Sequence, residues 1–231
     1  MPICAFCGQD VKKVTKDHIP PKSLFGKMTN YKLITVPSCR VCNEGTSKDD
    51  EYFMLLAIEW EASSHATAAN VMDSVRRSLL IPEKKRYRDD LMRNTKPTDL
   101  LTSSGLCIKQ GGELSVNLGR LAKTATKIVA GLYYHLQKKP VPVGYFAYCS
   151  LLDFILDGGP MDYVQKIKDD ILPTLASAPA TIIGPEVFCY RVGIVQSDPN
   201  IMFFLWELYN RYQFYGFVAR IDDEDQPIAK R

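Results

Sequence analysis

Two Cys-x-x-Cys pairs constrain the first part of this chain more than any other feature. The first pair is Cys4 and Cys7, and the second is Cys39 and Cys42. The short spacing within each pair turns two sulfur atoms toward one point, and four such sulfurs complete a tetrahedral zinc site. Because the two pairs stand far apart in the sequence, a folded segment must lie between them.

A structural zinc ion is the interpretation that the spacing favours. Residues 1–50 contain few large apolar side chains, so this segment would form a thin core that a metal ion stabilises. Four unrelated cysteines are one alternative, which the paired spacing argues against, and a redox dithiol is another. Zinc held by four thiolates has no position left for water, so it would not be the catalytic metal.

Between the cysteine pairs stand Asp17 and His18, and Asn43 follows Cys42 directly. Histidine titrates near neutral pH and therefore suits a general base that activates water. Aspartate and asparagine offer oxygen ligands, which Mg²⁺ and Mn²⁺ prefer. A zinc site at Cys42 would also hold Asn43 in place. These residues predict a second, catalytic metal site at Asp17 and Asn43.

The order Cys-x-x-Cys, Asp-His, Cys-x-x-Cys-Asn resembles the HNH (His-Me finger) endonucleases, and most closely their zinc-stapled subgroup, which includes phage recombination endonuclease VII. The run Asn43-Glu-Gly-Thr-Ser-Lys48 also resembles the HNH domain of CRISPR effector nucleases. The resemblance covers about residues 1–53. It implies a ββα-metal fold, with His18 as general base and one Mg²⁺ or Mn²⁺ on Asp17 and Asn43. The products would carry 5′-phosphate and 3′-hydroxyl ends.

The sequence departs from the family pattern at two places. The middle Asn of the pattern, which braces the hairpin, has Asn30 as its candidate. The third position is Asn43 rather than His, which is a known variation in the family. The loop Pro20-Pro21-Lys22 is compatible with the family and brings a cation near the predicted site.

These features predict a metal-dependent endonuclease that hydrolyses DNA phosphodiester bonds. A resolvase selective for branched DNA is one alternative, and it would usually act as a dimer. A zinc-finger module that binds DNA without catalysis is another; there Asp17-His18 would only cap a turn. A homodimer or a partner protein of the same system is compatible with each reading. Restriction, phage defence and a mobile element all remain open as biological settings.

The net charge of +3 on 231 residues is too small to establish nucleic-acid binding and does not oppose it. Lys22, Arg40 and Lys48 lie near the predicted site in the sequence, so they are candidates for phosphate contacts. Single exposed charges are as often simply solvated. We therefore expect these three residues to form part of a nucleic-acid interface because of their positions in the sequence.

The composition is that of a globular chain, with 46% hydrophobic and 24% charged residues. No apolar run approaches the roughly 20 residues of a membrane-spanning helix, and the first residues lack the pattern of a secretory signal. We therefore expect a cytoplasmic protein with no membrane partner. Cys107, Cys149 and Cys189 stand alone in apolar surroundings and are expected to be buried free thiols.

The predicted fold class is α+β, with residues 1–60 as the HNH module carrying the Cys4 zinc and residues 61–231 as an accessory domain of unknown role. The accessory part is expected to be a mixed helical domain that ends in an antiparallel β-meander. Periodicity and turn residues predict the following elements: a strand at 32–36, helices at 51–60, 66–80, 83–95, 118–137 and 160–174, a hairpin of 106–109 with 113–116 around Gly111-Gly112, and strands at 188–194, 201–208 and 211–221.

Overall fold

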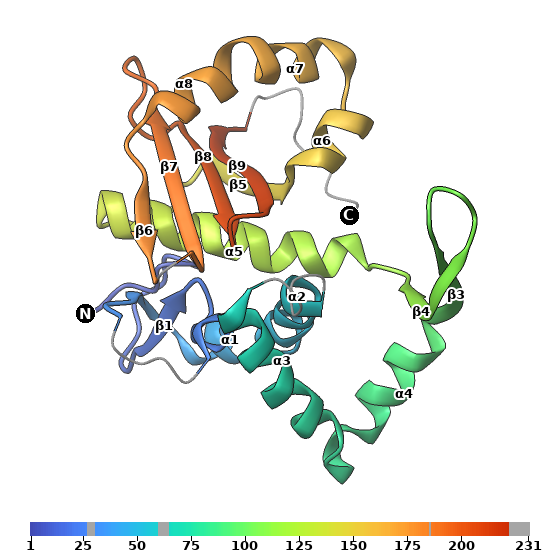
Figure 1. Ribbon diagram of the computed structural model, residues 1–231. Coiled ribbons are helices and arrows are strands. Elements are labelled where there is room, and N and C mark those ends of the chain that lie inside the picture. The colour runs from blue at the N-terminus through green and yellow to red at the C-terminus, as the bar shows by residue number, and fades with distance from the viewer. Residues whose placement is uncertain (27–30, 60–64, 185, 222–231) are drawn as a thin grey trace, which may run out of the picture.

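The computed structural model describes residues 1–26, 31–59, 65–184 and 186–221. It shows a mixed α+β chain with two two-stranded sheets and one five-stranded sheet, all antiparallel. Helix α5 (Leu118–Gln137) runs through the middle of the molecule, between the N-terminal elements and the five-stranded sheet (Figure 1). Within the described residues, no helix combines the length and the apolar character needed to cross a bilayer.

The N-terminal part is built from two strands followed by helices. Strand β1 (Thr15–Ile19) pairs with β2 (Ile34–Ser38), and a short 3₁₀ helix (Lys22–Phe25) lies between them in the chain. Helices α1 (Arg40–Glu44) and α2 (Ser47–Glu59) follow. The predicted strand is present, shifted by two residues toward the C-terminus.

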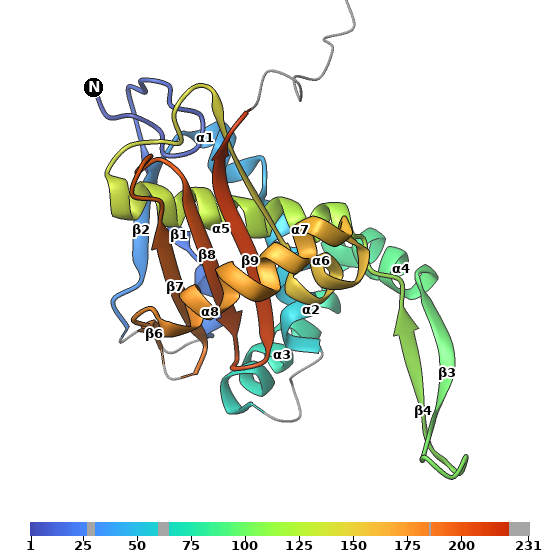
Figure 2. The same cartoon turned by 90° about the horizontal axis from the view of Figure 1, so that it is seen from above.

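The next helices and a hairpin form an extended arm that leaves the body of the molecule. Its base is α3 (Ala66–Leu79), a 3₁₀ turn (Pro82–Lys84) and α4 (Lys85–Arg93), which agree with the predicted helices at 66–80 and 83–95. Strands β3 (Thr95–Leu101) and β4 (Cys107–Leu114) then form a two-stranded hairpin that projects away from the body (Figure 2).

The hairpin prediction around Gly111-Gly112 is wrong. Both glycines lie within β4, opposite Thr98 and Pro97, and the chain reverses at residues 102–106 instead. There the Thr102 hydroxyl accepts a hydrogen bond from the Leu106 N–H group at 3.0 Å, and Gly105 adopts a φ of 85°. The chain thus reverses at the polar Thr-Ser-Ser-Gly turn and not at the glycine pair. A threonine or serine side chain can stabilise such a turn, because its hydroxyl accepts a hydrogen bond from a nearby backbone N–H group.

The five-stranded sheet has the order β5-β9-β8-β7-β6. Its last strands, β7 (Phe188–Ile194), β8 (Met202–Leu208) and β9 (Tyr212–Arg220), pair consecutively and confirm the predicted antiparallel meander. Strand β5 (Tyr145–Leu151) joins β9 at one edge, and β6 (Thr181–Ile183) joins β7 at the other. Neither edge strand was predicted from the sequence.

Each face of this sheet is covered by helices. Helix α6 (Leu152–Gly158), α7 (Met161–Lys166), a π-helical segment (Ile167–Ile171) and α8 (Leu172–Ser177) lie over the outer face (Figures 1 and 2). They bury Ile155, Ile167 and Leu175 against Tyr215 of β9. The predicted helix at 160–174 is therefore present, within a longer helical run that begins at α6.

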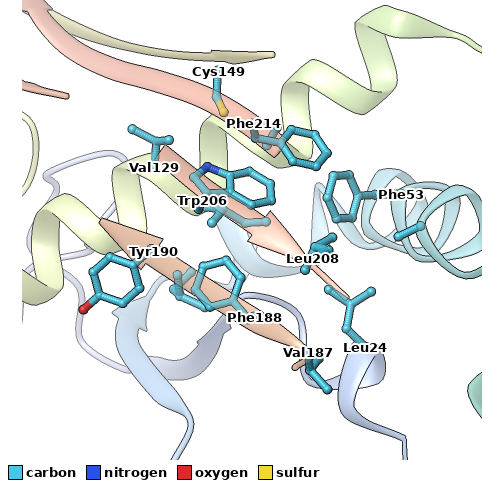
Figure 3. Close-up of a cluster of buried hydrophobic side chains, with 14 of the residues drawn as sticks. Leu24, Phe53, Val129, Cys149, Val187, Phe188, Tyr190, Trp206, Leu208 and Phe214 are labelled. Atoms are coloured by element: carbon cyan, nitrogen blue, oxygen red, sulfur yellow. The ribbon is translucent and has the colours of Figure 1, made fainter. Parts of the chain in front are cut away.

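The inner face forms the main core. Trp206 of β8 stacks on Phe214 of β9 with ring centroids 3.9 Å apart, and Phe53 of α2 packs against both (Figure 3). The same buried cluster includes Ile19 of β1 and Val129 of α5. One apolar core thus joins residues from both sides of position 60, while the functional division at that position stays a prediction.

Candidate metal centres

The four cysteines of the two Cys-x-x-Cys pairs come together in the structure. Their sulfur atoms all lie within 4.8 Å of one another, and the sulfurs of Cys7 and Cys39 are 3.9 Å apart. Tetrahedral zinc with bonds of about 2.3 Å requires sulfur atoms about 3.8 Å apart. The cluster therefore fits a metal ion of this kind, as the spacing predicts.

Backbone hydrogen bonds shape both cysteine turns. The first turn is closed by the Gly8 N–H group, which donates to the Cys4 carbonyl at 3.0 Å. In the second, Cys39 is the N-cap of α1, and its sulfur accepts a hydrogen bond from the Cys42 N–H group at 3.4 Å. The Cys39 N–H group donates to the Cys4 sulfur at 3.3 Å and so links the two turns.

The thiols differ in their surroundings. Burial raises the pKa of Cys42 and of Cys7. Burial also acts to raise the pKa of Cys4, but backbone N–H groups, that of Cys39 first, outweigh it and lower the value to about 6. One sulfur is thus favoured as a thiolate near neutral pH, and a Zn²⁺ ion held by the four cysteines would supply the positive charge that favours the thiolate form of the others.

Asn43 is held against the strand that carries Asp17. Alternation along β1 places Thr15 and Asp17 on one face, and the Asn43 Nδ2 group donates to the Thr15 hydroxyl at 2.8 Å. The amide nitrogen is thereby committed to Thr15. The amide oxygen, Oδ1, accepts no hydrogen bond from any residue that the structure describes, so it is available as a ligand.

Asp17 is only 9% exposed, and its two carboxylate oxygens differ. Oδ2 is buried and lies 2.9 Å from the Lys127 ammonium, which approaches it without the alignment of a hydrogen bond. Oδ1 is not buried and has no hydrogen bond to the described residues. One oxygen therefore faces a cation of the protein, and the other is open to a cation from solvent.

A second carboxylate, that of Asp50, also contacts the Lys127 ammonium. The Lys127 ammonium also donates to Asp50 Oδ2 at 3.1 Å and to the Thr46 hydroxyl at 2.7 Å. When all three charged groups are ionised, Asp17, Asp50 and Lys127 carry one net negative charge. Asp17 and Asn43 are the residues here that could offer oxygen ligands to a hard divalent cation.

His18 faces away from Asp17. It follows Asp17 on β1, pairs with Thr35 of β2, and is partly exposed on the other side of the strand. Within the described chain its imidazole forms no hydrogen bond or ion pair. Because neither ring nitrogen is occupied by a protein partner, the ring is free to meet a solvent molecule.

The three basic candidates near the site have different environments. Lys22 and Lys48 are exposed and form no ion pair with described residues. The Arg40 guanidinium instead binds both carboxylate oxygens of Glu44 through Nε, at 2.9 and 2.8 Å. Arg40 therefore already has an anionic partner on its own helix. Asn30, the candidate for the middle Asn, lies outside the described residues.

The sequence alone did not identify Thr15, Asp50 and Lys127 as neighbours of Asp17 and Asn43. Strand alternation was the available signal for Thr15, since it stands two residues before Asp17. For Lys127 the signal was a polar stripe on the helix at 118–137, where Arg120, Thr124 and Lys127 recur at helical spacing. The isolated cysteines also differ from expectation in part: Cys149 and Cys189 are buried, but Cys107 is exposed on the arm.

Comparison of the chain with protein-family models, with curated proteins and with solved structures finds no match. The resemblance to HNH endonucleases therefore depends on the residues of the N-terminal part. The structure adds a four-cysteine cluster able to hold a metal ion, on a frame of two strands and a helix.

Proposed function

We propose that this protein is a metal-dependent endonuclease that hydrolyses phosphodiester bonds in DNA. The observation that carries the proposal is the hydrogen bond from Asn43 to Thr15, which attaches the residue after Cys42 to the strand of Asp17 and His18. This bond thus links the cysteine cluster to the strand that carries Asp17 on one face and His18 on the other.

In this proposal the cysteine cluster holds a structural Zn²⁺. Cys39 and Cys42 belong to the start of α1, and Asn43 is the next helical residue. A rigid zinc centre therefore fixes the orientation of Asn43, as the surroundings of a metal ligand must. All four positions around the zinc are taken by thiolates, so the ion has no direct part in hydrolysis.

Asp17 and Asn43 would hold the catalytic cation through their free oxygen atoms. A bound Mg²⁺ or Mn²⁺ supplies a positive charge that stabilises the negative charge developing on the leaving 3′ oxygen. Mg²⁺ is commonly held by one or two protein oxygens together with water and phosphate, so two protein ligands suffice. Asp17 contributes the charge, and Asn43 contributes orientation.

His18 acts as the general base. Its imidazole accepts a proton from the attacking water as the water oxygen forms its bond to phosphorus. The bond from phosphorus to the 3′ oxygen breaks, which leaves a 5′-phosphate and, after protonation, a 3′-hydroxyl. Lys22 and Lys48 neutralise backbone phosphates of the bound DNA.

Plasmid cleavage tests the proposal directly. Wild-type protein is incubated with supercoiled plasmid and Mg²⁺ or Mn²⁺, beside His18→Ala and the matched control His135→Ala, which alters a histidine outside the site. Loss of a general base is expected to slow cleavage about 10²–10⁴-fold in His18→Ala only. Equal cleavage by both variants, or no cleavage of duplex, single-stranded and branched DNA by the wild type, would overturn the proposal.

Substrate preference separates the related readings. A resolvase cuts four-way junctions in preference to linear duplex at equal concentration. A zinc-finger module without catalysis binds DNA, and His18→Ala leaves that binding unchanged.

A further inference from the structure

Helix α5 lies along the inner face of β1 and contacts it at two successive points. Gly131 packs against Ile19 so closely that a β-carbon would stand 2.4 Å from the Ile19 Cδ1 atom. One helical turn earlier, Lys127 meets Asp17. Positions four apart on a helix lie on the same face, as do positions two apart on a strand. Gly131 and Lys127 on α5 therefore lie opposite Ile19 and Asp17 on β1.

The Lys127 ammonium has a fixed position. Two of its protons are donated to Thr46 and Asp50, and its side chain is only 10% exposed. It also lies 5.4 Å from the centre of the Phe6 ring, in the cysteine-bearing segment. A lysine held by contacts from several elements is no longer a flexible surface charge.

Helix α5 is itself anchored to the start of α2. Its Arg120 and Lys123 side chains bind the two carboxylate oxygens of Asp49 at 2.9 and 2.7 Å. The Thr124 hydroxyl donates to Asp50 at 3.1 Å. The position of Lys127 relative to Asp17 is thus determined by several contacts besides their own.

We propose that Lys127 is a positioning residue for the catalytic cation. It holds Asp17 Oδ2 on the protein side, which turns the free oxygen, Oδ1, toward the site. This inference rests on the proposed function, because it assigns Lys127 a role only through the ion that Asp17 would bind. The residue belongs to the sequence outside the HNH-like segment, so the rest of the chain completes the site.

A simpler role for Lys127 would be charge compensation for Asp50 alone. The double variant Lys127→Met/Asp50→Asn separates the two roles. In it the cluster keeps one net negative charge, as in the wild type, but Asp17 has lost its ammonium partner. Lys166→Met is the control, since it removes an exposed lysine from α7, a helix on the outer face of the five-stranded sheet.

The primary measurement is Mn²⁺ binding to zinc-loaded protein, followed by the electron paramagnetic resonance signal of free Mn²⁺. Loss of a group that orients a metal ligand weakens metal binding about 10–100-fold. We expect this loss in the double variant and unchanged binding in Lys166→Met. Plasmid cleavage at saturating Mn²⁺ is expected to fall in the double variant by a comparable factor. Zinc content and thermal unfolding check that each variant is folded.

Two results overturn the inference in different ways. If the wild type binds Mn²⁺ and cuts DNA, and the folded double variant does both within about twofold of it, Lys127 has no positioning role and the endonuclease proposal stands. If the wild type neither binds Mn²⁺ nor cuts DNA, the proposed function fails and the role of Lys127 fails with it. A double variant that does not fold is replaced by Lys127→Gln/Asp50→Asn, which keeps a polar group at the same position.

Discussion

The Asn43 side-chain amide donates to the Thr15 hydroxyl at 2.8 Å, across 28 residues of sequence. This bond joins α1 to β1 at the point where the cysteine cluster and the strand of Asp17 meet. It commits the nitrogen of Asn43 and leaves its oxygen uncommitted. The bond therefore selects which atom of the amide faces the proposed cation.

Thr15→Val tests this bond with little change in side-chain shape. Valine cannot accept the hydrogen bond, so Asn43 loses its fixed orientation, and we expect Mg²⁺-dependent cleavage to fall about 10–100-fold. The free energy of unfolding should fall by about 1–3 kcal/mol, because the variant also loses the hydrogen bond that the Thr15 hydroxyl donates to the Ser38 carbonyl at 2.9 Å. Cleavage rates and urea unfolding measure the two effects. Unchanged cleavage by a folded variant would contradict the assigned role of Asn43.

Cysteine substitution tests the zinc centre. Cys39→Ser removes one of four clustered sulfurs, and we expect loss of the bound zinc together with unfolding of the N-terminal segment. Cys107→Ser is the control, because Cys107 is an exposed thiol on the arm, away from the cluster. Elemental analysis should find one zinc per chain in the wild type and in the control. Zinc retained at full stoichiometry in Cys39→Ser would argue against the four-sulfur site.

Two glycines on α5 predict opposite effects of the same substitution. Gly131→Ala places a methyl group against Ile19 and is expected to destabilise the protein by about 1–3 kcal/mol through overpacking. Gly119→Ala meets only Asn117, at 3.4 Å, and should stabilise the helix by up to about 1 kcal/mol. Thermal unfolding of both variants gives the signs. A neutral Gly131→Ala would mean that α5 does not pack on β1 at this distance.

The ion pairs of Asp49 predict an acid-dependent contribution to stability. Burial acts to raise the pKa of Asp49, but Lys123 and Arg120 outweigh it and hold the pKa below its usual value. Because the pKa is lower in the folded protein than in the unfolded chain, the contribution is present above the unfolded value, near 4, and is lost as pH falls through the folded value.

Asp49→Asn isolates that contribution. The difference in unfolding free energy between the wild type and this variant should be largest near neutral pH and should shrink in acid. Taking the difference removes the parallel effect of acid on the zinc thiolates, which both proteins share. A difference that is independent of pH would show that Asp49 gains nothing from its two cations.

Local chemistry explains what the sequence predicted correctly. The pairing of Cys4, Cys7, Cys39 and Cys42 depends on short turns, and α5 follows from a long apolar stripe, so both are visible within a few residues. The reversal at 102–106 was missed because glycine pairs are strong turn signals, yet here they fill a strand. Strand β5 was missed because its partner, β9, stands far along the chain.

The contact between Lys127 and Asp17 could not be read from any window of sequence. The polar stripe on α5 marks Lys127 but does not point to Asp17, because their meeting depends on how α5 crosses β1. The same is true of Asp50, which belongs to α2. The charged cluster thus combines Asp17 of β1, Asp50 of α2 and Lys127 of α5. Of these, only Asp17 belongs to the motif that the sequence shows, the Asp-His pair.

The place of Lys127 in the chain also sets an order of events during synthesis. The cysteines, Asp17, His18 and Asn43 all leave the ribosome well before α5, and chains fold from the N-terminus as they emerge. Until α5 arrives, Asp17 has no ammonium beside it and Ile19 has no helix over it. A chain that stops early would thus carry every residue of the nuclease motif without the helix that orients it, so the proposed cutting activity would mature only in chains whose synthesis has passed α5.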